Sequence, residues 1–457
     1  MNRTEGMKKI IRNATIINEG KIFPADILIT NGRIEKLAPQ ISEKSFAEEI
    51  NGEGKFLFPG IIDDQVHFRE PGLTHKATIY SESKAAVAGG ITSFMEMPNT
   101  IPPATTIELL EAKYRIAQIT SLANYSFFLG TSNDNIEEVK KADPKKICGV
   151  KIFMGSSTGK LVVDDPRALE NIFHYAPTLI ATHCETDSVI KANEEKFRKE
   201  YGDAIPVELH PVIRNEAQCY QSSSLAITLA KNFESRLHIL HVSTEEELLL
   251  FTNSIPLDKK KITAEACVHH LWFDAEDYAP LGTLIKCNPA IKDARHKQKL
   301  LEALLDDRLD IIATDHAPHT WEEKHTLTPE GKINYFKTPS GLPLVQHSLN
   351  MMLEFYFQKK ISLEKIVEKM SHAPAVCYQV KDRGFIREGY FADLILLDLN
   401  PEWKVSKENI LYKCGWSPLQ AQSFHGQVTQ TFVNGRLVYS DGLFDESVNG
   451  MRLEFER

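Results

Sequence analysis

The chain has 457 residues, of which 42% are hydrophobic and 25% are charged, and its formal net charge at pH 7 is -9. This composition is typical of a soluble globular protein, and the length predicts two structural units. The negative charge argues against a nucleic-acid or anionic-membrane partner, because proteins that bind polyanions concentrate Lys and Arg. The seven cysteines form no CxxC pair, and no run of about 18 apolar residues occurs. We therefore expect a reduced, cytoplasmic protein without a membrane-spanning segment.

The first segment of the chain, to residue 59, has the pattern of short strands joined by turns. "KKIIRNATIIN" and "ADILITNGRIEKLA" are rich in β-branched residues, and Asn31-Gly32 is a hairpin signal. The same texture returns after residue 384, in "GFIREGYFADLILLDL" and in "QVTQTFVNGRLVYSDG". The simplest arrangement is that residues 1–59 and 384–457 pair into one small accessory β-sandwich domain formed by both chain ends.

Between these ends, residues 60–383 alternate short apolar runs with helical patterns such as "EAQCYQSSSLAITLAKNF" and "TEEELLLFTNS". Eight strand–helix units in roughly 300 residues match an α/β fold of the (β/α)8 TIM-barrel type. A doubly wound sheet can hold as many strands, so the count alone leaves both architectures open. The eight runs are "IIDDQVHF", "ITSFMEM", "YSFFLG", "ICGVKIFMG", "TLIATHCE", "LHILHVS", "ITAEACV" and "LDIIATDHA".

Polar residues cluster at the ends of these predicted strands. In a barrel the carboxyl ends of all strands point to one face, where catalytic groups gather. Neutral imidazoles and carboxylates suit Zn²⁺, which can lower the pKa of a bound water towards neutrality. The polar residues at or near strand ends are His67, Asn99, Lys151, His183, His241 and Asp315.

Lys151 and Asp315 would have special roles in such a site. A lysine that is desolvated in an apolar strand shifts towards the neutral amine, which can react with CO2 to give a metal-bridging carbamate. Asp315 would act as a ligand and as a general base. Taken singly, each residue has an ordinary alternative, as a snorkelling Lys, a capping Asp or a hydrogen-bonded His. Their alignment on one face favours the metal site.

Several other polar positions have weaker patterns. His269 and His270 are expected to pack or to support the site, and His210 and Arg214 to cap or brace a helix. The polar, turn-rich segment between His319 and Gly341 has two open interpretations. It is either a lid over the substrate or an inert surface insertion.

These motifs resemble those of dihydroorotases in the amidohydrolase superfamily. "DDQVHFREPG" resembles the first family signature, an Asp followed by His-x-His-x-Arg-x-Pro-Gly, and "ATDHAPHTWEEK" resembles the second. "MPNT", "VKIFMGSSTG", "ATHCE", "LHVST" and "CNPAIK" are similar to family segments in the same order. The likeness covers the whole barrel.

The resemblance implies reversible hydrolysis of (S)-dihydroorotate to N-carbamoyl-L-aspartate, a step of pyrimidine biosynthesis. It implies one or two Zn²⁺ ions per chain, bridged by a carbamylated Lys151, with Asp315 as the catalytic base, and it suggests a homodimer. The implied metal ligands are His67, Lys151, His183, His241 and Asp315. The implied substrate-binding residues are Arg69, Asn99, Asn288 and His319.

Gln65 departs from the family pattern, because the family has a His there. An amide ligates only through its carbonyl oxygen, which is a weak ligand for Zn²⁺. Either the more exposed metal is lost or loosely held, or Asp63 or Asp64 compensates.

Three alternatives to a dihydroorotase stay open on the sequence. They are an allantoinase, which shares "HFREPG", a dihydropyrimidinase-like enzyme, and a catalytically silent partner of an aspartate carbamoyltransferase. His319 together with Arg69 favours a substrate that carries a carboxylate.

Overall fold

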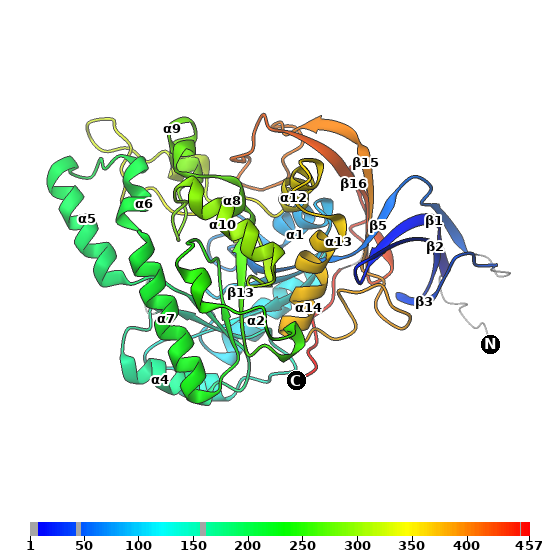
Figure 1. Cartoon of the computed structure of the whole chain (residues 1–457), viewed down its shortest axis with the longest axis horizontal. Coiled ribbons are helices and arrows are strands. Elements are labelled where there is room, and N and C mark those ends of the chain that lie inside the picture. The colour runs from blue at the N-terminus through cyan, green and yellow to red at the C-terminus, as the bar shows by residue number, and fades with distance from the viewer. Residues whose placement is uncertain (1–7, 43–46, 156–160, 448) are drawn as a thin grey trace.

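A computed structural model of the protein describes residues 8–42, 47–155, 161–447 and 449–457 (Figure 1). The last residues of the "VKIFMGSSTG" motif lie outside these ranges. Two units are evident in the strand pairing, a barrel of parallel strands and a sheet built from the two ends of the chain.

The nine barrel strands in the described ranges coincide with the eight apolar runs, because β8 and β9 share the run "YSFFLG". Hydrogen bonds connect β6, β7 and β8 in one parallel set and β9 to β14 in another, and a parallel bridge from Val66 to His316 closes the ring. This closure confirms the TIM barrel and excludes a doubly wound sheet. The strands are β6 (Ile61–Val66), β7 (Ile91–Glu96), β8 (Asn124–Phe127), β9 (Leu129–Gly130), β10 (Val150–Phe153), β11 (Ile180–His183), β12 (Leu237–Ile239), β13 (Ile262–Cys267) and β14 (Ile311–Ala313).

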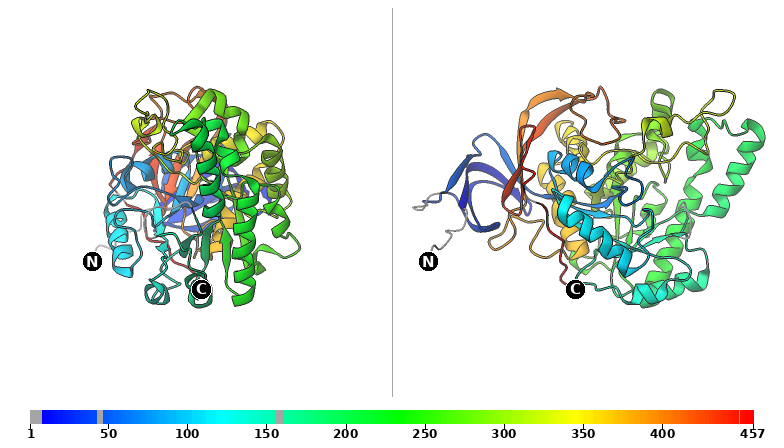
Figure 2. Two further views of the ribbon diagram at one scale, coloured as in Figure 1. Left: turned by 90° about the vertical axis from the view of Figure 1, so that its left-hand side faces the viewer. Right: turned by 180° about the vertical axis from the view of Figure 1, so that it is seen from behind.

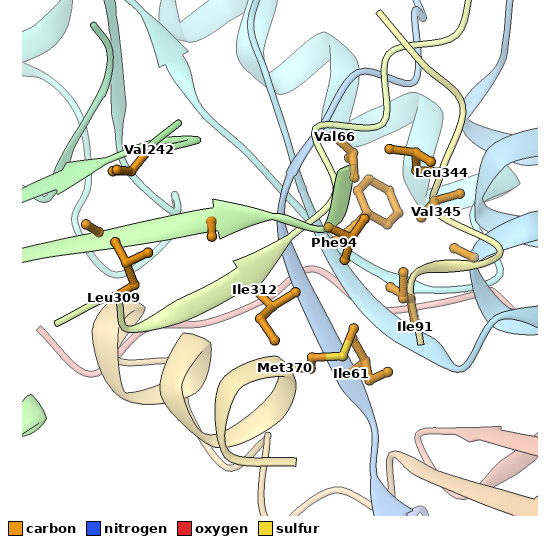
Figure 3. Packing of buried hydrophobic residues seen from close by; sticks show 14 of the residues in the cluster. Ile61, Val66, Ile91, Phe94, Val242, Leu309, Ile312, Leu344, Val345 and Met370 are labelled. Carbon is orange, nitrogen blue, oxygen red and sulfur yellow. The ribbon is translucent and has the colours of Figure 1, made fainter. Parts of the chain in front are cut away.

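Helices cover the outside of the barrel (Figures 1 and 2). Most begin at a side-chain cap, as at Thr106 and Asn215, whose oxygens accept backbone N–H groups of the first turn. The principal helices are α1 (Ile79–Ala88), α2 (Ile107–Thr120), α4 (Pro166–Tyr175), α5 (Asp187–Tyr201), α7 (Glu216–Phe233), α10 (Ala294–Leu305) and α12 (Ser348–Phe357). Their apolar faces pack on the strands, and Figure 3 shows Phe94, Ile312 and Met370 in this core.

One predicted helix is wrong. "TEEELLLFTNS" forms only a 3-10 turn at Glu247–Leu250. Its Glu247 side chain is buried and accepts hydrogen bonds from Ser223 and Thr244, so the residue that should face solvent on a surface helix is held inside the fold.

The two chain ends pair with each other, as expected. β5 (Phe56–Pro59) pairs in parallel with β1 (Lys8–Asn18) and antiparallel with β15 (Leu394–Lys404). The pairing describes one continuous nine-stranded sheet, so the two-layer sandwich that we expected is not confirmed. The other strands are β2 (Lys21–Thr30), β3 (Arg33–Ala38), β4 (Glu48–Asn51), β16 (Ser423–Val433), β17 (Arg436–Ser440) and β18 (Leu443–Phe444).

The domain boundaries at residues 59/60 and 383/384 stay a prediction. None of the helices in the described ranges is long and apolar enough to cross a membrane. All seven cysteines are free thiols.

Candidate active site

A cavity of about 1040 Å³ opens where the barrel strands end. Its size suits a small-molecule site. The residues that the sequence selected from seven separate segments converge here. The cavity is lined by Gln65, His67, Arg69, Asn99, Lys151, His183, His241, Asn288, Asp315 and His319.

His67 and Asp315 form the first pair of potential ligands. His67 Nε2 lies 3.0 Å from Asp315 Oδ1, and its Nδ1 lies 2.7 Å from Asn99 Oδ1. Since an amide oxygen only accepts, His67 donates from Nδ1 and turns Nε2 towards the carboxylate. Burial alone would raise the pKa of Asp315, but the hydrogen bond and charge of His67 outweigh it, so that the pKa is lowered. The contact therefore needs a cation between the two atoms, either the second proton of an imidazolium or a metal ion.

His183 and His241 form the second pair. His183 Nδ1 lies 2.8 Å from His241 Nε2. His183 Nε2 lies 2.9 Å from Glu185 Oε2, and because a carboxylate accepts, the proton of His183 sits on Nε2. The Nδ1 lone pair therefore points into the site, as a metal ligand requires.

Glu185 is a functional residue that the sequence analysis did not select. It is fully buried and accepts hydrogen bonds from Arg214 Nη1 at 2.5 Å and from Gln218 Nε2 at 3.0 Å. Arg214 was expected to cap or brace a helix, and here its guanidinium pairs with Glu185. The available signal was the position of Glu185, two residues after His183 at the end of β11.

Lys151 interacts electrostatically with one member of each pair, Asp315 and His241. It is 1% exposed, its Nζ sits 4.6 Å from the centre of the Phe153 ring, and it acts electrostatically on His241. Burial lowers the pKa of Lys151 to about 7, although the charge of Asp315 opposes the shift. A large neutral fraction of the amine at physiological pH is what carbamate formation requires. Together with the two pairs, it makes a donor set that fits a metal centre.

Gln65 has its carbonyl oxygen turned away from this donor set. Its Nε2 donates to Asp315 Oδ1 at 3.2 Å, and its Oε1 accepts from Cys267 Sγ at 3.6 Å. A carboxylate needs a donor and a thiol needs an acceptor, so the two neighbours fix the orientation of the amide. Neither Asp63 nor Asp64 lines the cavity, which argues against their compensating for the missing His.

A cationic group lies on the side of the cavity near Arg69. Arg69 Nη2 is 3.1 Å from His319 Nε2, and Lys76 Nζ is 3.1 Å from His319 Nδ1. Burial lowers the pKa of Arg69 only to about 10, so the guanidinium stays charged. Across the site, the buried Asn288 Oδ1 has no hydrogen-bond partner in the described ranges. Lys76, which the sequence analysis missed, is paired with Glu323 Oε1 at 2.9 Å, so Arg69 is the group that can bind an anion.

The segment between His319 and Gly341 supplies a wall of the cavity. Residues 335–341 line it. Lys286 Nζ donates to the carbonyl oxygens of Tyr335 and Thr338 at 2.6 and 2.7 Å. Lys324 Nζ donates to the carbonyl oxygens of residues 286, 339 and 341 at 3.0–3.2 Å. Residues 335–341 are therefore not an inert surface insertion, while closure of the segment as a lid stays a prediction.

The remaining histidines support the site from outside the reacting centre. His210 lines the cavity, where its Nδ1 lies 2.8 Å from the hydroxyl of Tyr335, so it braces the wall. His269 and His270 are buried outside the lining, and their packing or supporting role stays a prediction.

Comparisons with known proteins agree with this geometry. Residues 56–438 match the Amidohydrolase family. A dihydroorotase from Carboxydothermus hydrogenoformans is 33% identical and covers 93% of this chain and 96% of its own. An allantoinase from Deinococcus radiodurans is 29% identical over 97% of this chain and 98% of its own. The structure of an L-hydantoinase (dihydropyrimidinase) from Arthrobacter aurescens has a TM-score of 0.90 at 25% identity, covering 97% of this chain and 99% of its own.

Proposed function

Because the chain belongs to the amidohydrolase family, we propose that it is a dihydroorotase, which reversibly hydrolyses (S)-dihydroorotate to N-carbamoyl-L-aspartate in pyrimidine biosynthesis. The observation that carries the proposal is that two sets of side chains line the same cavity. One is the charged guanidinium of Arg69 beside the imidazole of His319, which suits a substrate carboxylate. The other is the set of paired imidazoles and carboxylate, which suits a metal ion.

The metal ligands in this proposal are His67, Lys151, His183, His241 and Asp315. The support is the 3.0 Å and 2.8 Å contacts within the two pairs and the pKa of Lys151 near 7, from which a carbamate would form. We propose one or two zinc ions per chain. When bound, zinc would polarise the amide carbonyl and acidify the attacking water.

Asp315 acts as the general base in this scheme. Its lowered pKa keeps the carboxylate ionised, so that it can take a proton from water and pass it to the ring nitrogen as the C–N bond breaks. The Nε2 of Gln65 donates to its Oδ1 and restricts its orientation. Arg69, Asn99 and His319 hold the substrate carboxylate and Asn288 faces the ring. Residues 335–341 limit access of water.

A second candidate is another cyclic amidohydrolase, a hydantoinase or an allantoinase. The similarity to the Arthrobacter hydantoinase and the Deinococcus allantoinase favours it. The Arg69–His319 contact at 3.1 Å favours dihydroorotate, because a neutral ring gives a buried guanidinium no anionic partner.

The test is to measure zinc per chain and hydrolysis of dihydroorotate, allantoin and a hydantoin on the same sample. We expect dihydroorotate to be the preferred substrate. We also expect Arg69→Gln to raise KM for dihydroorotate by roughly 10-fold or more, since a charge-assisted bond is lost. Turnover of only the uncharged rings would establish the second candidate. Bound metal with no turnover would point to a silent partner of another enzyme.

We further propose that the enzyme is a cytoplasmic homodimer, on the strength of its likeness to dihydroorotases. Light scattering on the eluting protein measures the mass directly. A mass of one chain would overturn the dimer without touching the assigned reaction.

A further inference from the structure

A second cluster of ligand-type side chains lies below the active site, inside the barrel. Asp64 on β6, His238 on β12 and Glu265 on β13 are all fully buried, and none of them lines the cavity. Asp64 directly precedes Gln65, and His238 lies three positions before His241. Because β6 and β12 are not neighbours in the strand order, the contact between Asp64 and His238 crosses the barrel interior.

The protonation of His238 can be derived from its neighbours. The hydroxyl of Thr263 lies 3.4 Å from the carbonyl oxygen of Leu237, to which it donates its single proton. His238 Nδ1 lies 2.8 Å from the same hydroxyl oxygen, and Nδ1 donates there when the hydroxyl proton goes to Leu237. In the neutral ring, Nε2 is then an acceptor.

This Nε2 atom faces two carboxyl groups. It lies 3.0 Å from Glu265 Oε2 and 3.4 Å from Asp64 Oδ2. Both oxygens of Asp64 are buried without a hydrogen-bond partner in the described ranges. Three such groups that converge in a fully buried place are costly unless protons or a metal cation join them.

We propose that Asp64, His238 and Glu265 bind a zinc ion that is separate from the active-site metal. The donor atoms are the two oxygens of Asp64, His238 Nε2 and Glu265 Oε2, and one ligand atom from each residue lies within 4.8 Å of the others. Ligands about 2.0–2.2 Å from one zinc ion lie roughly 3–3.5 Å apart, which the two measured separations match. The two carboxylates also balance the charge of the ion.

The neighbours of the cluster give it a structural role. Thr263 fixes the His238 tautomer, as the partner of a ligating imidazole does. Glu265 Oε1, which is not used for the ion, accepts the backbone N–H of His241 at 3.1 Å. An ion enclosed here would enter as the chain folds and would fix the backbone beneath His241.

The experiment measures zinc by mass spectrometry on full-length protein after an EDTA wash. The Lys151→Ala/His183→Ala double variant removes proposed ligands of the active site, and we expect it to retain about one zinc ion per chain. Adding Asp64→Asn to the double variant should remove that ion. Adding Asp63→Asn is the matched control, because Asp63 is an equally buried acid that accepts a hydrogen bond from Thr314 Oγ1 at 2.6 Å; it should leave the ion in place.

The proposal is overturned if the double variant contains no zinc although its circular dichroism spectrum is that of the native protein. It is also overturned if adding Asp64→Asn and adding Asp63→Asn to the double variant leave the same zinc content per chain. If the variant with Asp64→Asn does not fold, anomalous diffraction from crystals of the wild-type protein tests the proposal instead. An anomalous difference peak at the zinc edge between Asp64, His238 and Glu265 supports the site. A peak at the active site alone means that protons, not metal, join the three side chains, and the proposal fails.

Discussion

The Gln65 side chain acts through the hydrogen-bond donor and acceptor groups of its amide. Its donor end holds Asp315 and its acceptor end holds the thiol of Cys267. An imidazole at the same position would carry a nitrogen lone pair, which the oriented amide does not offer to the site. The side chain therefore orients the proposed base and is not expected to act as a metal ligand.

Restoring an imidazole should change the metal content. We expect Gln65→His to raise the zinc content by about one ion per chain, because a second nitrogen ligand joins His67 and Asp315. Gln65→Met is the control of similar length without a strong ligand, and it should bind no more zinc than the wild type. Loss of zinc in Gln65→Met would instead show that the amide oxygen is a ligand. Both are read by mass spectrometry of the purified protein.

Glu185 should affect metal affinity without touching the metal. Its carboxylate accepts the Nε2 proton of His183 and so keeps Nδ1 free to ligate. Glu185→Gln should weaken zinc affinity by about 10- to 100-fold, as substitutions of such supporting partners do. Competition with a chromogenic chelator measures it. Glu194→Gln, which alters an acid elsewhere in the cavity lining, is the control, and an equal loss there would contradict a specific role for Glu185.

At the scale of elements, the barrel was predictable because its strands are buried on both faces and read as continuous apolar runs. The positions of the proposed metal ligands at the strand ends could be predicted from that topology. The partners of those ligands did not, since Glu185 reaches Arg214 across 29 positions and Gln218 across 33, and only the packed fold brings them together. For the same reason, "TEEELLLFTNS" gave no sign that Glu247 turns inward.

The cavity wall at residues 335–341 depends on a buried lysine. Lys324→Met would leave three carbonyl oxygens without their donor, and each loss costs about 1–3 kcal/mol. We expect the wall to loosen, KM for dihydroorotate to rise, and limited proteolysis to cut between residues 326 and 341. Lys332→Met, at an exposed position in the same segment, is the control. Unchanged KM and an unchanged digestion pattern would show that other contacts hold the wall.

At the scale of the whole molecule, the fold keeps several imidazoles neutral by enclosing them. Burial lowers the pKa of His210 and His319 well below the ordinary value, and it lowers the pKa of His347 to about 3. His347 is not among the residues that line the cavity. It packs on Phe424 and Trp403 and contacts the hydroxyl of Tyr412. It therefore reports on folding without disturbing the proposed metal site.

The folded protein should lose stability in acid through His347. In the unfolded chain this group titrates near its ordinary pKa of 6.5, whereas in the folded chain it stays neutral down to about 3. Between these values the unfolded state binds the extra proton, so the stability present above pH 6.5 is lost as pH falls, by about 3 kcal/mol at pH 4. His347→Phe should flatten the decline of Tm from pH 7 to pH 4.5, whereas the exposed His174→Phe should leave it unchanged. Parallel curves for wild type and His347→Phe would mean that His347 does not set the acid sensitivity, and that the other buried histidines carry it.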